Sequence, residues 1–256
     1  MEMFDSHSHY NDEKFDEDRE EIIKEAYNSG VTRLIVAGYN LESSKEAVKI
    51  ANNHEFIYAI CGVSPNDVND LPSDYLDHIR AQVHASKVVA IGEIGLDYYW
   101  NKDNKDLQKK VFKEQIKLAN ELNLPIVIHT REAVMDTINI LKNEMKCKRK
   151  GVFHCCPLNI ELIKEALKLG YFISFAGPIT FKNSKNANQV IEMVPLERML
   201  VETDCPYLSP EPLRGKRNDS RNVKYIISKI AEVKNKKIEE IAKITYENAS
   251  TIFKIK

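Results

Sequence analysis

The sequence lacks the features that mark secreted, membrane-spanning and disulfide-stabilised proteins. No apolar run approaches the ~20 residues that a membrane-spanning helix needs. The N-terminal segment MEMFDSHSHY has neither the basic nor the apolar region of a secretory signal. The 5 cysteines are odd in number and form no CxxC motif, so a disulfide framework is not expected. We therefore expect a cytoplasmic protein with no membrane segment.

An excess of charge of one sign and linker-like segments are also absent. The formal net charge is -1, so any contact with nucleic acid must come from a local patch or from bound metal ions. No stretch rich in proline, glycine or serine divides the chain, which indicates one domain over residues 1–256. No coiled-coil seam suggests assembly, and we expect a monomer.

Short apolar runs alternate with amphipathic stretches along the whole chain. Several runs, such as LIVA and VVAI, are continuously apolar, which is typical of parallel strands buried on both faces. Eight strands are predicted, at Met3–Ser6, Arg33–Gly38, Ile57–Cys61, Val88–Ile91, Ile126–His129, Gly151–His154, Tyr171–Ser174 and Met199–Glu202. The alternation predicts an α/β protein, and 256 residues match the ~250 of a (β/α)8 TIM barrel. An open doubly wound sheet is the alternative, but no GxGxxG motif follows the first run.

The amphipathic stretches predict helices between the strands. The helices are expected at Phe15–Asn28, Leu41–Asn53, Asp106–Leu122, Ala133–Glu144, Ile160–Leu169, Ala187–Met193, Asn222–Val233 and Ile238–Phe253. Asp106 suits the N-cap position of its helix. The last segment is expected to pack outside the barrel.

Histidines and carboxylates fall where the predicted strands end. They are His7, His9, Glu93, His129, His154 and Asp204. A closed parallel barrel brings the carboxyl ends of all its strands to one rim, and imidazoles and carboxylates converging there are typical of a divalent metal site. Alone, His129, His154 or Asp204 is more simply explained as a hydrogen-bonded core or capping residue, the histidines at 7 and 9 as solvated side chains of a polar loop, and Glu93 as a salt-bridge carboxylate. Their joint placement favours the metal site, and we interpret His54, His78 and His84, which lack it, as solvated.

The individual positions suggest roles within such a site. On an extended strand Asp5, His7 and His9 share one face, so Asp5 can orient an imidazole ligand from behind. Glu93 has two carboxylate oxygens and can bridge two cations, which an imidazole cannot do. Cys156 follows His154 closely, but inert packing is the simpler interpretation.

Basic residues cluster where a barrel often binds phosphate. The segment RGKRN, with Arg214 and Arg217, follows the eighth predicted strand, and Lys182 and Arg131 follow the seventh and the fifth. The planar guanidinium of arginine suits phosphate oxygens. These four side chains are candidate phosphate contacts, and a solvated charge run is the alternative.

Taken together, these motifs resemble the TatD family of metal-dependent deoxyribonucleases over nearly the entire chain. The resemblance rests on DSHSH near the start, GEIGLDYY around Glu93, IVIHTR, His154, and the run LVETDCPYLSPEPLRGKRND. It implies a (β/α)8 barrel that binds two divalent ions, Mg²⁺, Mn²⁺ or Zn²⁺. By that resemblance His7, His9 and Asp204 hold one ion, His129 and His154 hold the second, and Glu93 bridges both.

The implied reaction is hydrolysis of DNA phosphodiester bonds, commonly from a 3′ end. We interpret Glu93 and Asp204 as catalytic, with Asp204 accepting a proton from a metal-activated water. The sequence departs from the family where Ser64 and Asn66 replace two usual histidines, and where Cys155 and Cys156 follow His154.

Two alternatives stay open. An amidohydrolase acting on a small ester, lactone or amide uses a similar barrel, although such enzymes commonly bridge their metals with a carbamylated lysine where Glu93 stands here. A nucleic-acid or phosphate-binding protein that has lost catalysis is the other, because Ser64 and Asn66 lack imidazoles.

Overall fold

The computed structural model describes residues 1–85 and 87–256, and it contains a barrel of eight parallel strands. Each strand pairs in parallel with the next along the chain, in the order β1 to β8. The strands are β1 Met3–Ser8, β2 Val31–Ala37, β3 Ile57–Cys61, β4 Val88–Asp97, β5 Ile126–Arg131, β6 Gly151–Phe153, β7 Phe172–Phe175 and β8 Met199–Val201. The predicted single-domain (β/α)8 fold is confirmed.

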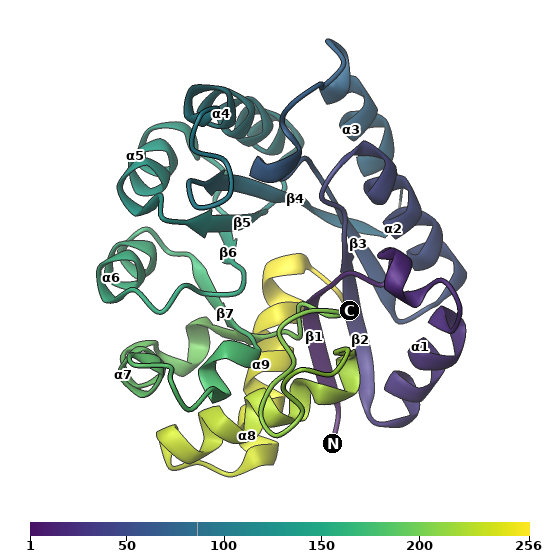
Figure 1. Cartoon of the computed structure of the whole chain (residues 1–256), viewed down its shortest axis with the longest axis vertical. Helices are drawn as coiled ribbons and strands as arrows, with labels where there is room; N and C mark the ends of the chain where they lie inside the picture. Colours follow the sequence, from purple (N-terminus) through teal and green to yellow (C-terminus); the bar gives the residue numbers. More distant parts are fainter. Residues whose placement is uncertain (86) are drawn as a thin grey trace.

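Helices follow the strands and surround them (Figure 1). They are α1 Arg19–Asn28, α2 Leu41–Asn53, α3 Tyr75–Val83, α4 Lys105–Leu122, α5 Val134–Glu144, α6 Ile160–Lys168, α7 Ala187–Met193, α8 Val223–Lys234 and α9 Ile238–Phe253. The expected cap of α4 is wrong, because Asn104 occupies the N-cap position and Asp106 lies in the first turn. The expected helix from Phe15 begins only at Arg19, after a separate 3-10 turn at Glu13–Phe15. No helix in the described part of the chain combines the length and apolar character needed to cross a membrane.

Residues just beyond β8 join the two ends of the sheet. The backbone N–H of Asp204 donates to the carbonyl of His7 at 3.0 Å, and the N–H of His9 donates to the carbonyl of Cys205 at 2.7 Å. The closure of the barrel therefore depends on the same segments that carry three predicted metal ligands. Folding of the barrel and assembly of the site are coupled at this seam.

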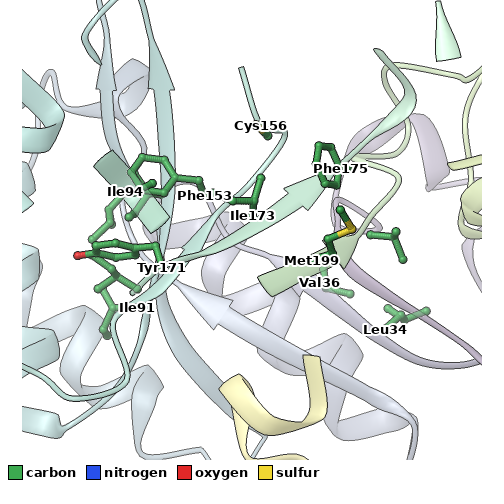
Figure 2. Close-up of a cluster of buried hydrophobic side chains, with 14 of the residues drawn as sticks. Leu34, Val36, Ile91, Ile94, Phe153, Cys156, Tyr171, Ile173, Phe175 and Met199 are labelled. Atoms are coloured by element: carbon green, nitrogen blue, oxygen red, sulfur yellow. The ribbon is translucent and has the colours of Figure 1, made fainter. Parts of the chain in front are cut away.

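Side chains along each strand alternate between two apolar layers. In β2, Leu34 and Val36 pack with residues of the surrounding helices, whereas Ile35 and Ala37 face the barrel interior. Figure 2 shows part of the outer layer, in which Leu34 and Val36 lie near Met199 and Phe175. Burial of both strand faces explains why the strands were readable as continuous apolar runs.

The C-terminal helix closes the amino end of the barrel. Ala249, Ile252 and Phe253 of α9 belong to the same buried cluster as the inward-facing strand residues. Arg33, near the start of β2, donates to the carbonyl of Lys256 at 3.1 Å. In Figure 1, α9 lies inward of the other helices, next to β1. The prediction that this segment packs outside the barrel is therefore wrong, because the interior needs apolar side chains at its open amino end. The carboxyl end is left for the site.

Candidate metal centre

The structure brings all six predicted ligand residues together at the carboxyl rim. They come from five strands or the residues just after them: His7, His9, Glu93, His129, His154 and Asp204. Glu93 lies within β4 rather than after it, at an irregularity in the ladder between Ile91 and Ile94. Gly95 permits this path, since its φ is +149° and a Cβ there would lie 1.9 Å from the carbonyl oxygen of His129.

One group of donors comprises His7, His9 and Asp204. The Nε2 atoms of His7 and His9 lie 3.3 Å apart. The Oδ1 atom of Asp204 lies 3.2 Å from Nε2 of His9 and 3.8 Å from Nε2 of His7. The Oε2 atom of Glu93 lies 3.5 Å from Nε2 of His7 and 3.9 Å from that of His9. Two imidazoles and two carboxylates therefore converge on one point.

A second group comprises His129, His154 and the other oxygen of Glu93. The Oε1 atom of Glu93 lies 2.9 Å from Nδ1 of His129 and 3.1 Å from Nε2 of His154. These two ring nitrogens lie 3.3 Å apart. The two carboxylate oxygens of Glu93 thus face different sets of imidazoles.

The donor sets fit divalent cations. Bonds of about 2.0–2.2 Å from a metal ion to nitrogen or oxygen place neighbouring ligand atoms about 3.0–3.5 Å apart. Most of the distances within the two groups lie in or close to that range. The mixed imidazole and carboxylate set suits zinc as well as manganese or magnesium.

The imidazoles compensate the charges of the buried carboxylates. Burial on its own raises the pKa of a carboxyl group, but the imidazoles of His154, His129 and His7 hold the pKa of Glu93 well below its usual value. Burial likewise opposes ionisation of Asp204, and His9 together with the other rings lowers its pKa to about 2. Both carboxylates are therefore ionised and available to bind cations.

The pKa values of the imidazoles shift in opposite directions, because burial outweighs the carboxylates at His7 but not at His9 or His154. Burial lowers the pKa of His7, which the carboxylates offset only in part. Burial opposes protonation of His9 and His154 too, but Asp204 raises the pKa of His9, and Glu93 and Glu202 raise that of His154 well above its usual value. Cations bound among these groups would take over the role of the protons.

Asp97, which sequence reasoning missed, holds His129 from behind. Its Oδ2 atom lies 2.9 Å from Nε2 of His129 and accepts the ring proton. The lone pair of Nδ1 then faces Oε1 of Glu93 at 2.9 Å, where a proton or a cation must separate the two acceptors. A bound cation would satisfy this contact as well as a proton does. Asp97 belongs to the GEIGLDYY motif around Glu93, and this motif was the feature of the sequence that could have pointed to it.

Glu202 is a second missed carboxylate, fully buried behind the rim. Its Oε1 atom accepts from the backbone N–H of Cys155 at 2.5 Å and lies 3.4 Å from Nδ1 of His154. Among the described residues, Nδ1 of His154, Nδ1 of His7 and Oε2 of Glu202 are buried without a hydrogen-bond partner. Glu202 thus faces the rear nitrogen of His154 while Nε2 of that ring faces the cavity.

Asp5 does not orient an imidazole, so that prediction is wrong. Its carboxylate accepts from the hydroxyls of Thr203 and Ser220, each at 2.5 Å, and from the backbone N–H of Thr203 at 2.9 Å. The register of β1 shifts between Asp5 and Ser8, so the simple alternation of faces fails there. Burial raises the pKa of Asp5 to about 7. Asp5 anchors the segment that presents Asp204.

A cavity of about 900 Å³ opens above the candidate metal ligands. Arg131 lines this cavity, as do Ser64 and Asn66. Ser64 donates to Oδ2 of Asp67 at 2.7 Å, and Asn66 accepts from the side-chain amide of Asn101 at 3.1 Å. The two substituted positions therefore face the space where a substrate would bind.

The other basic candidates lie away from the cavity lining. Lys182 is exposed, and the guanidinium of Arg214 lies 4.2 Å from the ring centroid of Phe181. Arg217 donates to Asp18 at 3.0 and 2.5 Å, which occupies its guanidinium. Of the four predicted phosphate contacts, only Arg131 lines the cavity.

The remaining histidines and Cys156 lie outside the centre. His78 and His84 are exposed, whereas His54 is half-buried beside Phe56, so it is less solvated than expected. The thiol of Cys156 is buried and donates to the carbonyl of Pro157 at 3.3 Å. None of these side chains belongs to a metal-competent group of the described residues.

A (β/α)8 barrel with such donors at its carboxyl rim is the architecture of metal-dependent hydrolases. The chain belongs to the family of TatD-related DNases, whose family model matches residues 4–254. This membership confirms the resemblance seen in the sequence and makes the protein a metal-dependent hydrolase acting on ester bonds.

Individual relatives and a solved structure match over full length. The chain is 45% identical to the uncharacterized metal-dependent hydrolase YabD of Bacillus subtilis, over 99% of each chain. It is 30% identical to the 3'-5' ssDNA/RNA exonuclease TatD of Pectobacterium parmentieri, over 99% of this chain and 100% of that one. The crystal structure of YJJV, a TatD homolog from Escherichia coli K12, matches with a TM-score of 0.94 at 27% identity, over 99% of this chain and 98% of that chain.

Proposed function

We propose that this protein is a deoxyribonuclease that removes nucleotides from the 3′ end of single-stranded DNA, using two divalent ions. The observation that carries the proposal is the orientation of Glu93, whose two oxygens face two separate groups of imidazoles. The similarity to a relative named as a 3'-5' ssDNA/RNA exonuclease supports the substrate class and the polarity. We propose Glu93 and Asp204 as the catalytic residues.

Divalent ions held by the two groups would polarise the phosphoryl oxygens and acidify a water molecule. Asp204 is ionised, because its pKa is lowered to about 2, and its position beside His9 suits it to accept the proton of the attacking water. Asp97 and Glu202 hold His129 and His154 in place, so the ligand atoms need little rearrangement during the reaction. Arg131 at the cavity wall would contact a phosphate of the bound strand.

Metal analysis combined with digestion of end-labelled single-stranded DNA tests this proposal. We expect Mg²⁺, Mn²⁺ or Zn²⁺ to restore activity to the chelator-treated protein, and products that shorten from the 3′ end. Glu93→Gln and Asp204→Asn should each lower kcat by at least about a hundredfold, because each removes charge at the reacting centre. The exposed His78 provides a matched control, and His78→Gln should retain full activity.

Equal rates in wild type, Glu93→Gln and Asp204→Asn would overturn the proposal. Turnover of a lactone panel without any cleavage of DNA would instead favour the amidohydrolase alternative. Tight binding of metal and DNA with no hydrolysis under any of the three metals would favour a binding protein.

A further inference from the structure

Two exposed aromatic side chains stand at the entrance to the metal cavity. Tyr99 and Trp100 follow β4 after one intervening residue, and they are 43% and 64% exposed. Trp100 lines the same cavity as Glu93 and His129. A large apolar ring left in water beside a catalytic centre is informative, because most large aromatic side chains are substantially buried.

A carboxylate behind the candidate metal centre holds the backbone of Tyr99 and Trp100 in place. The Oδ1 atom of Asp97 accepts from the backbone N–H groups of Tyr99 at 2.9 Å and of Trp100 at 3.0 Å. The other oxygen of the same carboxylate holds His129. The position of Trp100 is therefore tied to the metal ligands through one side chain.

Arg131, at the end of β5, lines the cavity beside Trp100. Its guanidinium lies 3.7 Å from the ring centroid of Tyr99 and 5.4 Å from that of Trp100. Arg217 and Arg221, by contrast, are paired with carboxylates. Arg131 thus presents its charge beside an exposed indole, and this pairing suits a ligand with a flat ring next to an anionic group.

We propose that Trp100 and Arg131 form a subsite that stacks one unpaired nucleobase of the substrate on the indole and binds its phosphate, next to the bond that is cleaved. This subsite rests on the nuclease function proposed above and explains a preference for single strands. A base in a duplex is already stacked and paired, so it must be extracted at a cost of a few kcal/mol before it can reach Trp100.

The chain contains 1 tryptophan, so its fluorescence reports on this subsite directly. The metal-loaded protein is titrated with a short oligodeoxythymidylate whose 3′-terminal linkages are phosphorothioates, which slow hydrolysis. We expect the fluorescence of Trp100 to be quenched on binding. The same oligonucleotide with abasic residues at its 3′ end should bind more weakly and quench much less.

Variants measure the contribution to affinity by anisotropy of a labelled oligonucleotide. Trp100→Ala should raise Kd about 5- to 150-fold, which corresponds to stacking of about 1–3 kcal/mol at 1.4 kcal/mol per tenfold. Trp100→Phe should retain most of the affinity, since it keeps an aromatic face. Tyr27 is a matched control, because it is 48% exposed on α1 and lines a different cavity, and Tyr27→Ala should leave Kd unchanged.

A Kd for Trp100→Ala within twofold of wild type, or equal quenching by the abasic oligonucleotide, would overturn the subsite. These results are separable from failure of the nuclease proposal. Hydrolysis that does not depend on Trp100 contradicts only the subsite. Base-dependent quenching without hydrolysis in the unmodified strand contradicts only the nuclease proposal.

Discussion

Two imidazoles of the candidate metal centre, those of His129 and His154, have carboxylates behind them, and these orient the ring nitrogen that faces the cavity. Asp97 accepts from Nε2 of His129, whereas Glu202 lies against Nδ1 of His154. The two rings consequently present opposite nitrogens, Nδ1 and Nε2, to the same oxygen of Glu93. Small displacements of either carboxylate would misplace a ligand atom.

Replacing Glu202 should therefore weaken metal binding without removing one of the six proposed ligands. We expect Glu202→Gln to lower metal affinity about 10- to 100-fold, the usual effect of losing a carboxylate behind a ligating histidine. Competition with a chromogenic chelator measures the affinity. Glu165→Gln on α6, where the half-buried carboxylate pairs with Lys142, is the control, and an unchanged affinity in Glu202→Gln would contradict the assigned role.

Gly95 keeps β4 and β5 close enough for Glu93 and His129 to meet. In Gly95→Ala the new methyl group would collide with the carbonyl of His129. We therefore expect the free energy of unfolding to fall by about 3 kcal/mol or more. Gly215 also has a positive φ, of +87°, but nothing lies within 4 Å of a Cβ built there. Gly215→Ala should lower the free energy of unfolding, measured with urea, by only about 1–2 kcal/mol. Equal losses would show that crowding at Gly95 is not the cause.

The sequence indicated which candidate ligands meet at the rim but not the residues that hold them. The six that could be recognised, because strand ends in a closed barrel share one rim, are His7, His9, Glu93, His129, His154 and Asp204. Asp97 and Glu202 act through side chains from other strands, and no spacing along the chain encodes such contacts.

At the scale of elements, α9 supports the barrel from the end opposite the metal centre. We expect Phe253→Ala to lower the free energy of unfolding by about 3–5 kcal/mol, because the side chain is 3% exposed and fills the amino end of the interior. The kcat of the folded variant should stay close to that of wild type. Ile238→Ala, at a 40% exposed position of the same helix, should change stability by less than about 0.5 kcal/mol.

If Phe253→Ala lowered the free energy of unfolding no more than Ile238→Ala, the proposed role of α9 in filling the amino end of the barrel would be contradicted. If Phe253→Ala lowered kcat as much as a variant of a metal ligand does, the two ends of the barrel would not be functionally independent.

Element prediction succeeded where burial alone determines the pattern. The strands were recognisable as continuous apolar runs, and α2, α7 and α9 have the expected bounds. The helix α3 was missed because it buries only Tyr75 and Ile79, too few positions for a helical period. The packing position of α9 was mispredicted, because a periodic pattern shows which face of a helix is apolar but does not show which part of the protein that face packs against.

At the scale of the whole molecule, metal binding and barrel closure share the segments around His7, His9 and Asp204. Bound cations should therefore stabilise the fold. We expect removal of metal by a chelator to lower the midpoint of urea unfolding, and return of Mn²⁺ at a hundred times its Kd to restore about 2.7 kcal/mol per occupied site. An unchanged midpoint after chelation would show that the ions bind without differential affinity for the folded state.

Anomalous diffraction from a crystal soaked in Mn²⁺ tests whether Glu93 bridges two cations at the rim of the barrel. We expect two peaks, one among His7, His9, Asp204 and Oε2 of Glu93, the other between Oε1 of Glu93 and the rings of His129 and His154. A single peak, or none between these side chains, would contradict the bridging role of Glu93.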